Sequence, residues 1–130
     1  MILIRPVKPD DAVALSRIAL SAKAHWGYPE RWMEIWTSQL TFTGEYFKEN
    51  ESWIAEVSGS PIAFYTLQEK NGIAWLENLW VLPEYMGKGI GKRLFVHAVE
   101  ISRQRGFTKL RLESDPNAAV FYEKMGMSKN

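Results

Sequence analysis

Three glycines alternate with other residues at Gly87, Gly89 and Gly91, between a segment that predicts a strand and one that predicts a helix. Glycines at alternate positions let the backbone pass close to a bound molecule. The first turn of the following helix also leaves its N–H groups without partners, at the positive end of the helix dipole. With the charges of Lys88 and Lys92 beside it, this loop favours a phosphate or pyrophosphate ligand. A glycine-rich turn without a ligand is the alternative.

Two other nucleotide-binding loops fit this stretch less well. A P-loop requires Gly where Met86 stands and Ser or Thr where Arg93 stands. A Rossmann fingerprint requires its third glycine where Lys92 or Leu94 stands, although Glu113 does follow at about the twenty-residue distance that this fingerprint expects. A Rossmann loop also opens its domain, whereas this loop comes late in the chain. Both alternatives are therefore disfavoured.

The hydrophobic pattern predicts one domain over residues 1–130, with the element order β-α-α-β-β-β-α-β-α. Strands are expected over 2–7, 53–57, 61–67, 73–82 and 108–113, and helices from Asp10 or Asp11, over 30–40, over 89–104 and over 118–125. Residues 41–52 are polar and turn-like. The apolar positions expected to line the first helix are Val13, Ala14, Ile18 and Ala22, and those of the second are Trp32, Ile35, Trp36 and Leu40.

The composition excludes several classes of protein. Of 130 residues, 46% are hydrophobic and 24% charged, which is a globular rather than a disordered composition. The absence of cysteine excludes disulfide scaffolds, cysteine-bound metal clusters and thiol nucleophiles. A formal charge of +1 gives no reason to expect nucleic-acid binding. No apolar run approaches the ~20 residues of a membrane span. We therefore expect a cytoplasmic protein without membrane or nucleic-acid partners.

Two motifs together resemble the GNAT superfamily of acetyl-CoA-dependent N-acetyltransferases. They are VLPEYMGKGIGK at residues 81–92 and NAAVFYEKMG at residues 117–126, in the family's order and spacing. The element order agrees with that fold from residue 2 to residue 126. The resemblance implies a mixed α/β domain with a central mixed sheet, splayed at the acetyl-CoA site. In this family the loop amides wrap the pyrophosphate of coenzyme A, and the preceding strand pairs with the pantetheine arm.

Carried over residue by residue, the resemblance implies a set of acetyl-CoA contacts. The pyrophosphate contacts are Met86, Gly87, Lys88, Gly89, Ile90, Gly91 and Lys92, and the pantetheine and acetyl contacts are the backbones of Leu79, Trp80 and Val81. Backbone N–H groups alone can polarise an acetyl carbonyl. The implied cosubstrate is acetyl-CoA, and no metal is expected.

The sequence departs from the family pattern at three places. Met86 stands where the family usually has Gln or Arg, and Asp115 stands where many members have Asn. Asn117, two residues later, is then the expected cofactor contact. The family's last two strands are not expected within this sequence, which would leave the edge of strand 108–113 unpaired. We expect a homodimer contact at that edge.

Acetyl transfer to an amine requires a base for the ammonium proton and an acid for the departing thiolate. Tyr122 occupies the position where the family's Tyr commonly faces the coenzyme sulfur, and a core-packed Tyr is the alternative. Glu77 or Glu113 is the expected base, directly or through a water; an ordinary salt-bridged carboxylate is the alternative for each. Strand alternation places Trp75, Glu77 and Leu79 on one face.

The acceptor side is expected at the turn between the first two helices. His25, Trp26 and Tyr28 are the candidate acceptor contacts there, whereas His97 is expected in mid-helix, facing solvent. The resemblance implies direct transfer of an acetyl group from acetyl-CoA to a primary amine, on a small molecule or a peptide. A non-catalytic acyl-CoA-binding module of the same fold is the alternative.

Overall fold

The computed structural model describes residues 2–25, 27 and 29–112 and contains one five-stranded sheet in the order β1-β2-β3-β4-β5. The strands are β1 (Ile2–Pro6), β2 (Glu51–Val57), β3 (Ser60–Lys70), β4 (Ile73–Val81) and β5 (Leu110–Leu112). Neighbouring strands are antiparallel except β4 and β5, which are parallel. The sheet is therefore mixed, as the sequence predicts.

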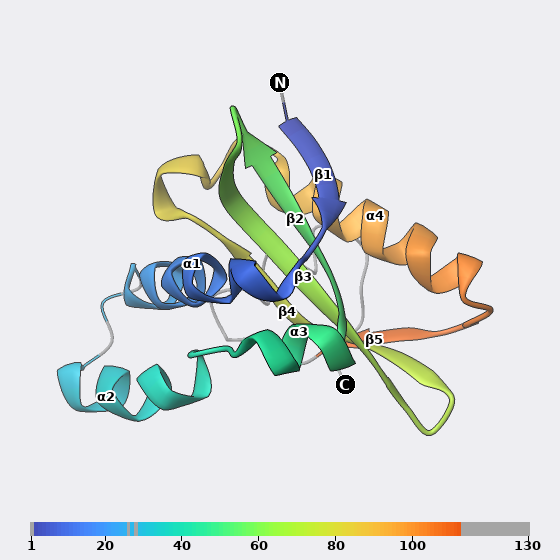
Figure 1. The fold of residues 1–130 in the computed structure, drawn as a ribbon, viewed down its shortest axis with the longest axis horizontal. Coiled ribbons are helices and arrows are strands. Elements are labelled where there is room, and N and C mark those ends of the chain that lie inside the picture. Colours follow the sequence, from blue (N-terminus) through green and yellow to red (C-terminus); the bar gives the residue numbers. More distant parts are fainter. Residues whose placement is uncertain (1, 26, 28, 113–130) are drawn as a thin grey trace.

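Helices cover both faces of this sheet (Figure 1). They are α1 (Ala12–Ala24), α2 (Glu30–Gln39), α3 (Gly44–Glu49) and α4 (Ile90–Gln104), with short 3-10 turns at Pro9–Asp11 and Pro83–Tyr85. α1 and α3 pack on one face and α4 packs on the other. Each face has its own core, because alternate residues of β3 point to opposite sides: Phe64 packs under α1 and α3, and Tyr65 packs under α4.

The sequence pattern misses α3, which lies inside the segment expected to be a turn. Thr43 caps this helix, accepting a hydrogen bond from the Tyr46 amide at 3.2 Å. Phe47 is buried beneath it and packs edge-on against Phe64 at 6.2 Å between ring centroids. At six residues, α3 is too short for hydrophobic periodicity to reveal it, and tertiary packing of Phe47 stabilises it.

The two N-terminal helices are present where they are expected, but their apolar faces differ. In α1 the buried positions are Ala12, Leu15, Ser16, Ile18, Ala19 and Ala22. Val13, expected among the apolar positions of this helix, is 71% exposed, because it lies on the opposite side of the helix from the buried positions. In α2, Ile35 is 60% exposed and Trp32 is also exposed. The expected apolar stripe of α2 therefore faces solvent at these two residues.

A bulge in β4 changes which side chains share a face. Leu76 pairs with Leu67, but Asn78 pairs with Thr66, so Glu77 is an extra residue in β4. Beyond the bulge, Leu79 packs in the α4 core. Before the bulge, the ring of Trp75 lies beneath the ammonium of Lys70. The prediction that Trp75, Glu77 and Leu79 share one face is therefore wrong, because the extra residue reverses the alternation.

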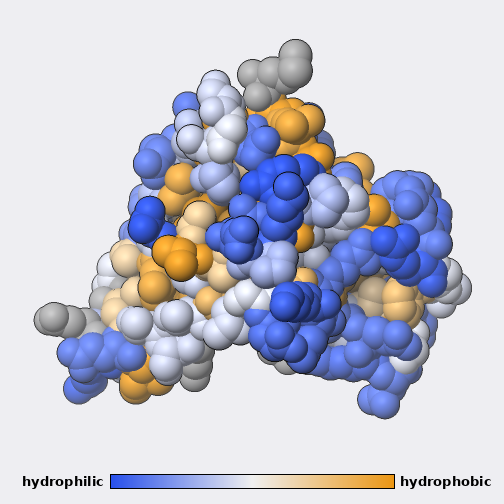
Figure 2. All heavy atoms as spheres, in the orientation of Figure 1, coloured by the Kyte–Doolittle hydropathy of each residue, from blue (hydrophilic) through white to orange (hydrophobic). Residues whose placement is uncertain are grey.

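The surface in Figure 2 is mixed in hydropathy. Hydrophobic atoms lie among hydrophilic ones over α1 and α2, while the side near the C-terminal end of α4 is mostly hydrophilic. Among the described residues, no helix has the length and apolar content needed to cross a membrane.

Candidate active site

The glycine loop follows β4 directly and has the conformation that its sequence predicts. A 3-10 turn at Pro83–Tyr85 leads into Met86, and then Gly87 and Gly89 adopt φ of +77° and +81°. Residues other than glycine rarely adopt this left-handed backbone conformation. A Cβ atom built at either glycine would meet no atom of the described residues within 4 Å. The loop therefore presents bare backbone to open space, where a ligand can approach closely.

The N-terminus of α4 opens onto this loop. Outside helices and strands, no hydrogen bond between described residues has an amide of residues 87–92 as its donor. The first turn of α4 contains no acidic residue, and Lys88, Lys92 and Arg93 are exposed around it. Unpaired N–H groups, the helix dipole and three cations suit an anion with several acceptor oxygens. The residues present thus fit the pyrophosphate of coenzyme A.

The strand segment expected to hold the acetyl group runs straight into the loop. Leu79, Trp80 and Val81 pair with β3 on one side, opposite Tyr65, Phe64 and Ala63 respectively. The Leu82 amide donates to the Ile62 carbonyl at 2.9 Å and continues the ladder to the start of the loop. Leu79 and Val81 face α4, whereas Trp80 faces α1 and α3.

Glu77 lies in the bulge just before that segment. Its carboxylate forms an ion pair with the ammonium of Lys70, and the Glu77 side chain is 19% exposed. The charge of Glu77 also acts on Tyr46: burial is the main cause that raises the pKa of Tyr46, and the Glu77 charge adds to it. Glu77 is therefore a half-buried carboxylate beside the strand segment that the sequence assigns to the acetyl group.

Sequence reasoning missed a group of polar residues next to Glu77. Trp80 Nε1 donates to Asn78 Oδ1 at 3.0 Å, and Asn78 Nδ2 donates to the Tyr46 hydroxyl at 3.0 Å. Asn78 is only 8% exposed. The available signal was an asparagine beside Glu77 in a mostly apolar strand, because a buried amide needs partners for both its donor and its acceptor.

Of the two histidines, only His97 has surroundings that differ from the expected ones. His25 is exposed at the C-terminal end of α1, near the expected acceptor side. His97 does not face solvent freely: its Nδ1 lies 2.7 Å from the hydroxyl of Tyr65, and Trp53 packs against its ring. The remaining candidates, Trp26, Tyr28, Glu113, Asn117 and Tyr122, lie outside the described residues.

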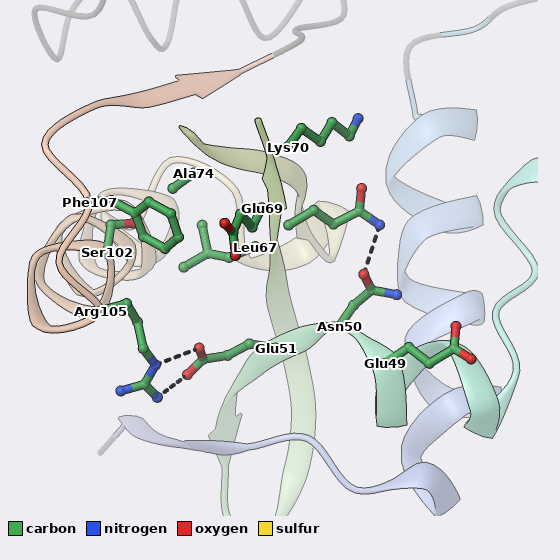
Figure 3. A pocket seen from close by; sticks show the side chains of 11 residues that line it. Glu49, Asn50, Glu51, Leu67, Glu69, Lys70, Ala74, Ser102, Arg105 and Phe107 are labelled. Carbon is green, nitrogen blue, oxygen red and sulfur yellow. Dashed lines mark hydrogen bonds and ion pairs between the residues drawn. The ribbon is translucent and has the colours of Figure 1, made fainter. Parts of the chain in front are cut away.

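A pocket of about 550 Å³ lies at the opposite end of β4 from the glycine loop (Figure 3). Arg105, joined to Glu51 by hydrogen bonds of 2.7 and 3.1 Å, lies on its α4 side, and Asn50 lies on its α3 side. None of the described residues assigned to acetyl-CoA or to proton transfer lines it. Within the described ranges, no cluster of His, Asp or Glu has the arrangement of a metal site.

Comparison with known sequences identifies several related enzymes. The model of the acetyltransferase (GNAT) family matches residues 17–127. A putative ribosomal protein bS18-alanine N-acetyltransferase of Bacillus subtilis is 31% identical, over 67% of each chain. The 5-NmdU N-acetyltransferase of Pseudomonas phage PaMx11 is 26% identical, over 98% of this chain and 88% of that enzyme. A glucosamine 6-phosphate N-acetyltransferase of Trypanosoma brucei brucei is 41% identical, but over only 42% of this chain and 37% of that enzyme.

Solved structures agree with this assignment. The PaiA N-acetyltransferase of Thermoplasma acidophilum, solved with coenzyme A, has a TM-score of 0.83 and 25% identity, covering 96% of this chain and 88% of that one. A GCN5-related N-acetyltransferase of Ralstonia eutropha shares the fold with a TM-score of 0.81 at 19% identity, covering 100% and 94% of the two chains. Since the family model spans most of the sequence and the fold agrees, the chain belongs to the GNAT family of acetyltransferases.

Proposed function

We propose that this acetyltransferase moves the acetyl group of acetyl-CoA directly to a primary amine. The observation that carries the proposal is the glycine loop at the start of α4, where Gly87 and Gly89 adopt the left-handed conformation and the amides of residues 87–92 have no backbone acceptor outside helices and strands among the described residues. The similarity to an N-acetyltransferase solved with coenzyme A supports the same ligand.

In this proposal the loop binds the pyrophosphate through residues 86–92. Its amides donate to the phosphate oxygens, and Lys88 and Lys92 neutralise part of their charge. The Met86 side chain has no donor, and its amide, which donates to the Pro83 carbonyl at 3.2 Å, would have to share that donor with a phosphate oxygen. Asn117, by its position in the second motif, adds a contact from the last helix.

The backbone of Leu79, Trp80 and Val81 holds the pantetheine arm and aims N–H groups at the acetyl carbonyl. Acetyl-CoA supplies an activated acetyl group as a thioester. The amine nitrogen forms a bond to the carbonyl carbon, and the carbon–sulfur bond breaks, so that the acetyl group leaves the thiol for the amine. Backbone donors stabilise the negative charge that develops on the carbonyl oxygen.

Two protons move in this reaction. Glu77, or Glu113 in its place, accepts the proton that the amine loses, directly or through one water. The ion pair with Lys70 holds the Glu77 carboxylate beside this strand segment. Tyr122 donates its phenolic proton to the departing thiolate, and solvent restores it.

The acceptor is a primary amine on a small molecule or a peptide. The related enzymes are named for three dissimilar acceptors, namely glucosamine 6-phosphate, 5-NmdU and an alanine of ribosomal protein bS18. The family therefore varies the acceptor pocket around one reaction. His25, Trp26 and Tyr28, between α1 and α2, are the proposed acceptor contacts.

Two measurements test the proposal. Acetyl-CoA at millimolar concentration should raise the melting temperature, and release of CoA thiol should then identify a productive amine within a panel of small amines and peptides. The chain contains no cysteine, so a thiol reagent reports CoA without background from the protein. No thermal shift would contradict the acetyl-CoA site. A shift without turnover on any amine would favour an acyl-CoA-binding module, the alternative that Met86 suggests.

A further inference from the structure

A chain of side-chain hydrogen bonds braces the part of β4 that the proposed function assigns to the acetyl group. The buried amide of Asn78 is held from both ends: Trp80 Nε1 donates to its oxygen, and its nitrogen donates to the Tyr46 hydroxyl, each at 3.0 Å. Trp80 lies two residues along the same strand, whereas Tyr46 belongs to α3. The amide therefore ties β4 to a separate element.

The same network of side-chain hydrogen bonds extends to the neighbouring strands. Thr66 lies opposite Asn78 in the register, is fully buried, and forms a hydroxyl contact of 2.8 Å with Ser52 of β2. Burial raises the pKa of Tyr46, and hydrogen bonds with Asn78 and Thr66 oppose this only in part. The phenol therefore stays protonated at neutral pH, and the network that joins α3, β2, β3 and β4 carries no charge.

The position of Asn78 in β4 gives this network a role beyond supplying partners for buried polar atoms. Asn78 is the first residue after the bulge at Glu77 and the last before the segment Leu79–Val81. A slip of one residue would turn Asn78 toward the α4 face, away from Tyr46. The hydrogen bond from Asn78 to Tyr46 of α3 therefore favours the observed register of β4 and the place of Glu77, and the bond from Trp80 fixes the orientation of the Asn78 amide.

We propose that Asn78, anchored by Tyr46, is a positioning residue for acetyl transfer. It holds the amides of Leu79–Val81 in the orientation that polarises the acetyl carbonyl, and it holds the bulge that carries Glu77. Donors that stabilise a developing charge work only when they are already oriented, so a small displacement lowers the rate without weakening ligand binding. This inference rests on the proposed function.

The chain offers matched controls for each end of the network. Tyr46→Phe removes one phenolic hydroxyl from the network, and Tyr65→Phe removes one from the α4 face, where it contacts His97. Trp80→Phe removes an indole donor to a side chain two residues back, at 3.0 Å, and Trp53→Phe removes an equivalent donor to Glu51, at 3.1 Å. The paired variants lose similar hydrogen bonds, but only Tyr46 and Trp80 are bonded to Asn78. Tyr65 lies opposite Leu79 in the register, so its variant also controls for a lost hydroxyl beside the same strand segment.

The experiment compares CoA affinity, carbonyl polarisation and turnover in these four variants. Acetyl-CoA labelled with ¹³C at the carbonyl reports polarisation by the infrared frequency of that carbonyl when bound. Calorimetry with CoA gives affinity, and thiol release gives kcat on the best amine of the panel. In Tyr46→Phe and Trp80→Phe we expect the carbonyl frequency to move back toward that of free acetyl-CoA. We expect kcat to fall about 10- to 100-fold while the Kd for CoA stays within about twofold.

Tyr65→Phe and Trp53→Phe should keep the wild-type frequency and kcat. The inference is overturned if Tyr46→Phe and Trp80→Phe, folded and binding CoA, match their controls in frequency and kcat. The inference is also overturned if kcat and CoA affinity fall together, since that result indicates a general loss of structure. A wild-type protein that does not bind CoA at all would instead overturn the proposed function.

Discussion

The hydroxyl of Tyr65, in the centre of β3, lies 2.7 Å from Nδ1 of His97 on α4. Trp53 also packs against the imidazole, with ring centroids 4.7 Å apart and an angle of 60° between the ring planes. Burial lowers the pKa of His97, and the nearby carboxylate of Glu51, itself bound to Arg105, only partly opposes this. The contact therefore favours a neutral imidazole that accepts the phenolic hydrogen.

The first prediction is that the protein loses stability as pH falls through about 6.5, the ordinary pKa of histidine. Because the pKa of His97 is lower in the folded state, the unfolded chain binds the proton first, and protonation favours unfolding. Melting temperatures measured between about pH 8 and pH 5 should therefore decline on the acidic side. His97→Gln should flatten that decline, and His25→Gln, at the exposed end of α1, should not. An unchanged slope in His97→Gln would show that other groups cause it.

The second prediction concerns Gly89, whose φ is +81° at the start of α4. Gly89→Val places a β-branched side chain in the open space assigned to the pyrophosphate, so CoA binding should be lost. For wild type, CoA at 100 times its Kd should add ~2.7 kcal/mol of stability. That gain, measured by thermal melting, should vanish in Gly89→Val.

A matched control separates lost binding from backbone strain. Gly72, in the turn between β3 and β4, also has a positive φ of +77° and no atom near a built Cβ. Gly72→Val should lower the melting temperature of the free protein yet keep the full CoA-dependent gain. Retention of that gain in Gly89→Val would place the phosphates elsewhere.

The third prediction is that Glu77→Gln lowers turnover, because the amide cannot accept the proton of the amine. A general base contributes about 10²–10⁴ in rate. The loss in kcat should shrink at high pH, where more of the amine is already deprotonated. Glu69→Gln, on the exposed end of β3, is the control and should retain activity. If Glu113→Gln shows the larger and pH-dependent loss, the base is Glu113.

The fourth prediction is that Tyr122→Phe lowers kcat by about 10²–10⁴, since it removes the proton donor while keeping the aromatic ring. The Kd for acetyl-CoA should stay nearly constant, because the proposed phosphate and pantetheine contacts lie on other elements. Steady-state kinetics and calorimetry on the same sample separate these quantities. A parallel loss of affinity would make the hydroxyl a binding contact, and turnover within about threefold of wild type would assign proton donation to water.

Local signals in the sequence are enough to predict the strand-to-helix loop, most of the helices and strands, and the family. These follow from local properties: glycine tolerates positive φ at positions 87 and 89, and apolar periodicity distinguishes strands from α4. Such signals need only a few neighbouring residues, so they can be recognised from the sequence alone.

The face of Glu77, the presence of α3 and the network around Asn78 depend instead on contacts between segments that are distant in the sequence. The bulge at Glu77 depends on the pairing of β4 with β3, and the contact between Asn78 and Tyr46 joins residues 32 apart in the chain. Likewise, His97 contacts the Tyr65 hydroxyl because β3 passes beneath α4. Sequence periodicity assumes regular alternation and solvent on one side, and both assumptions fail where distant segments pack together.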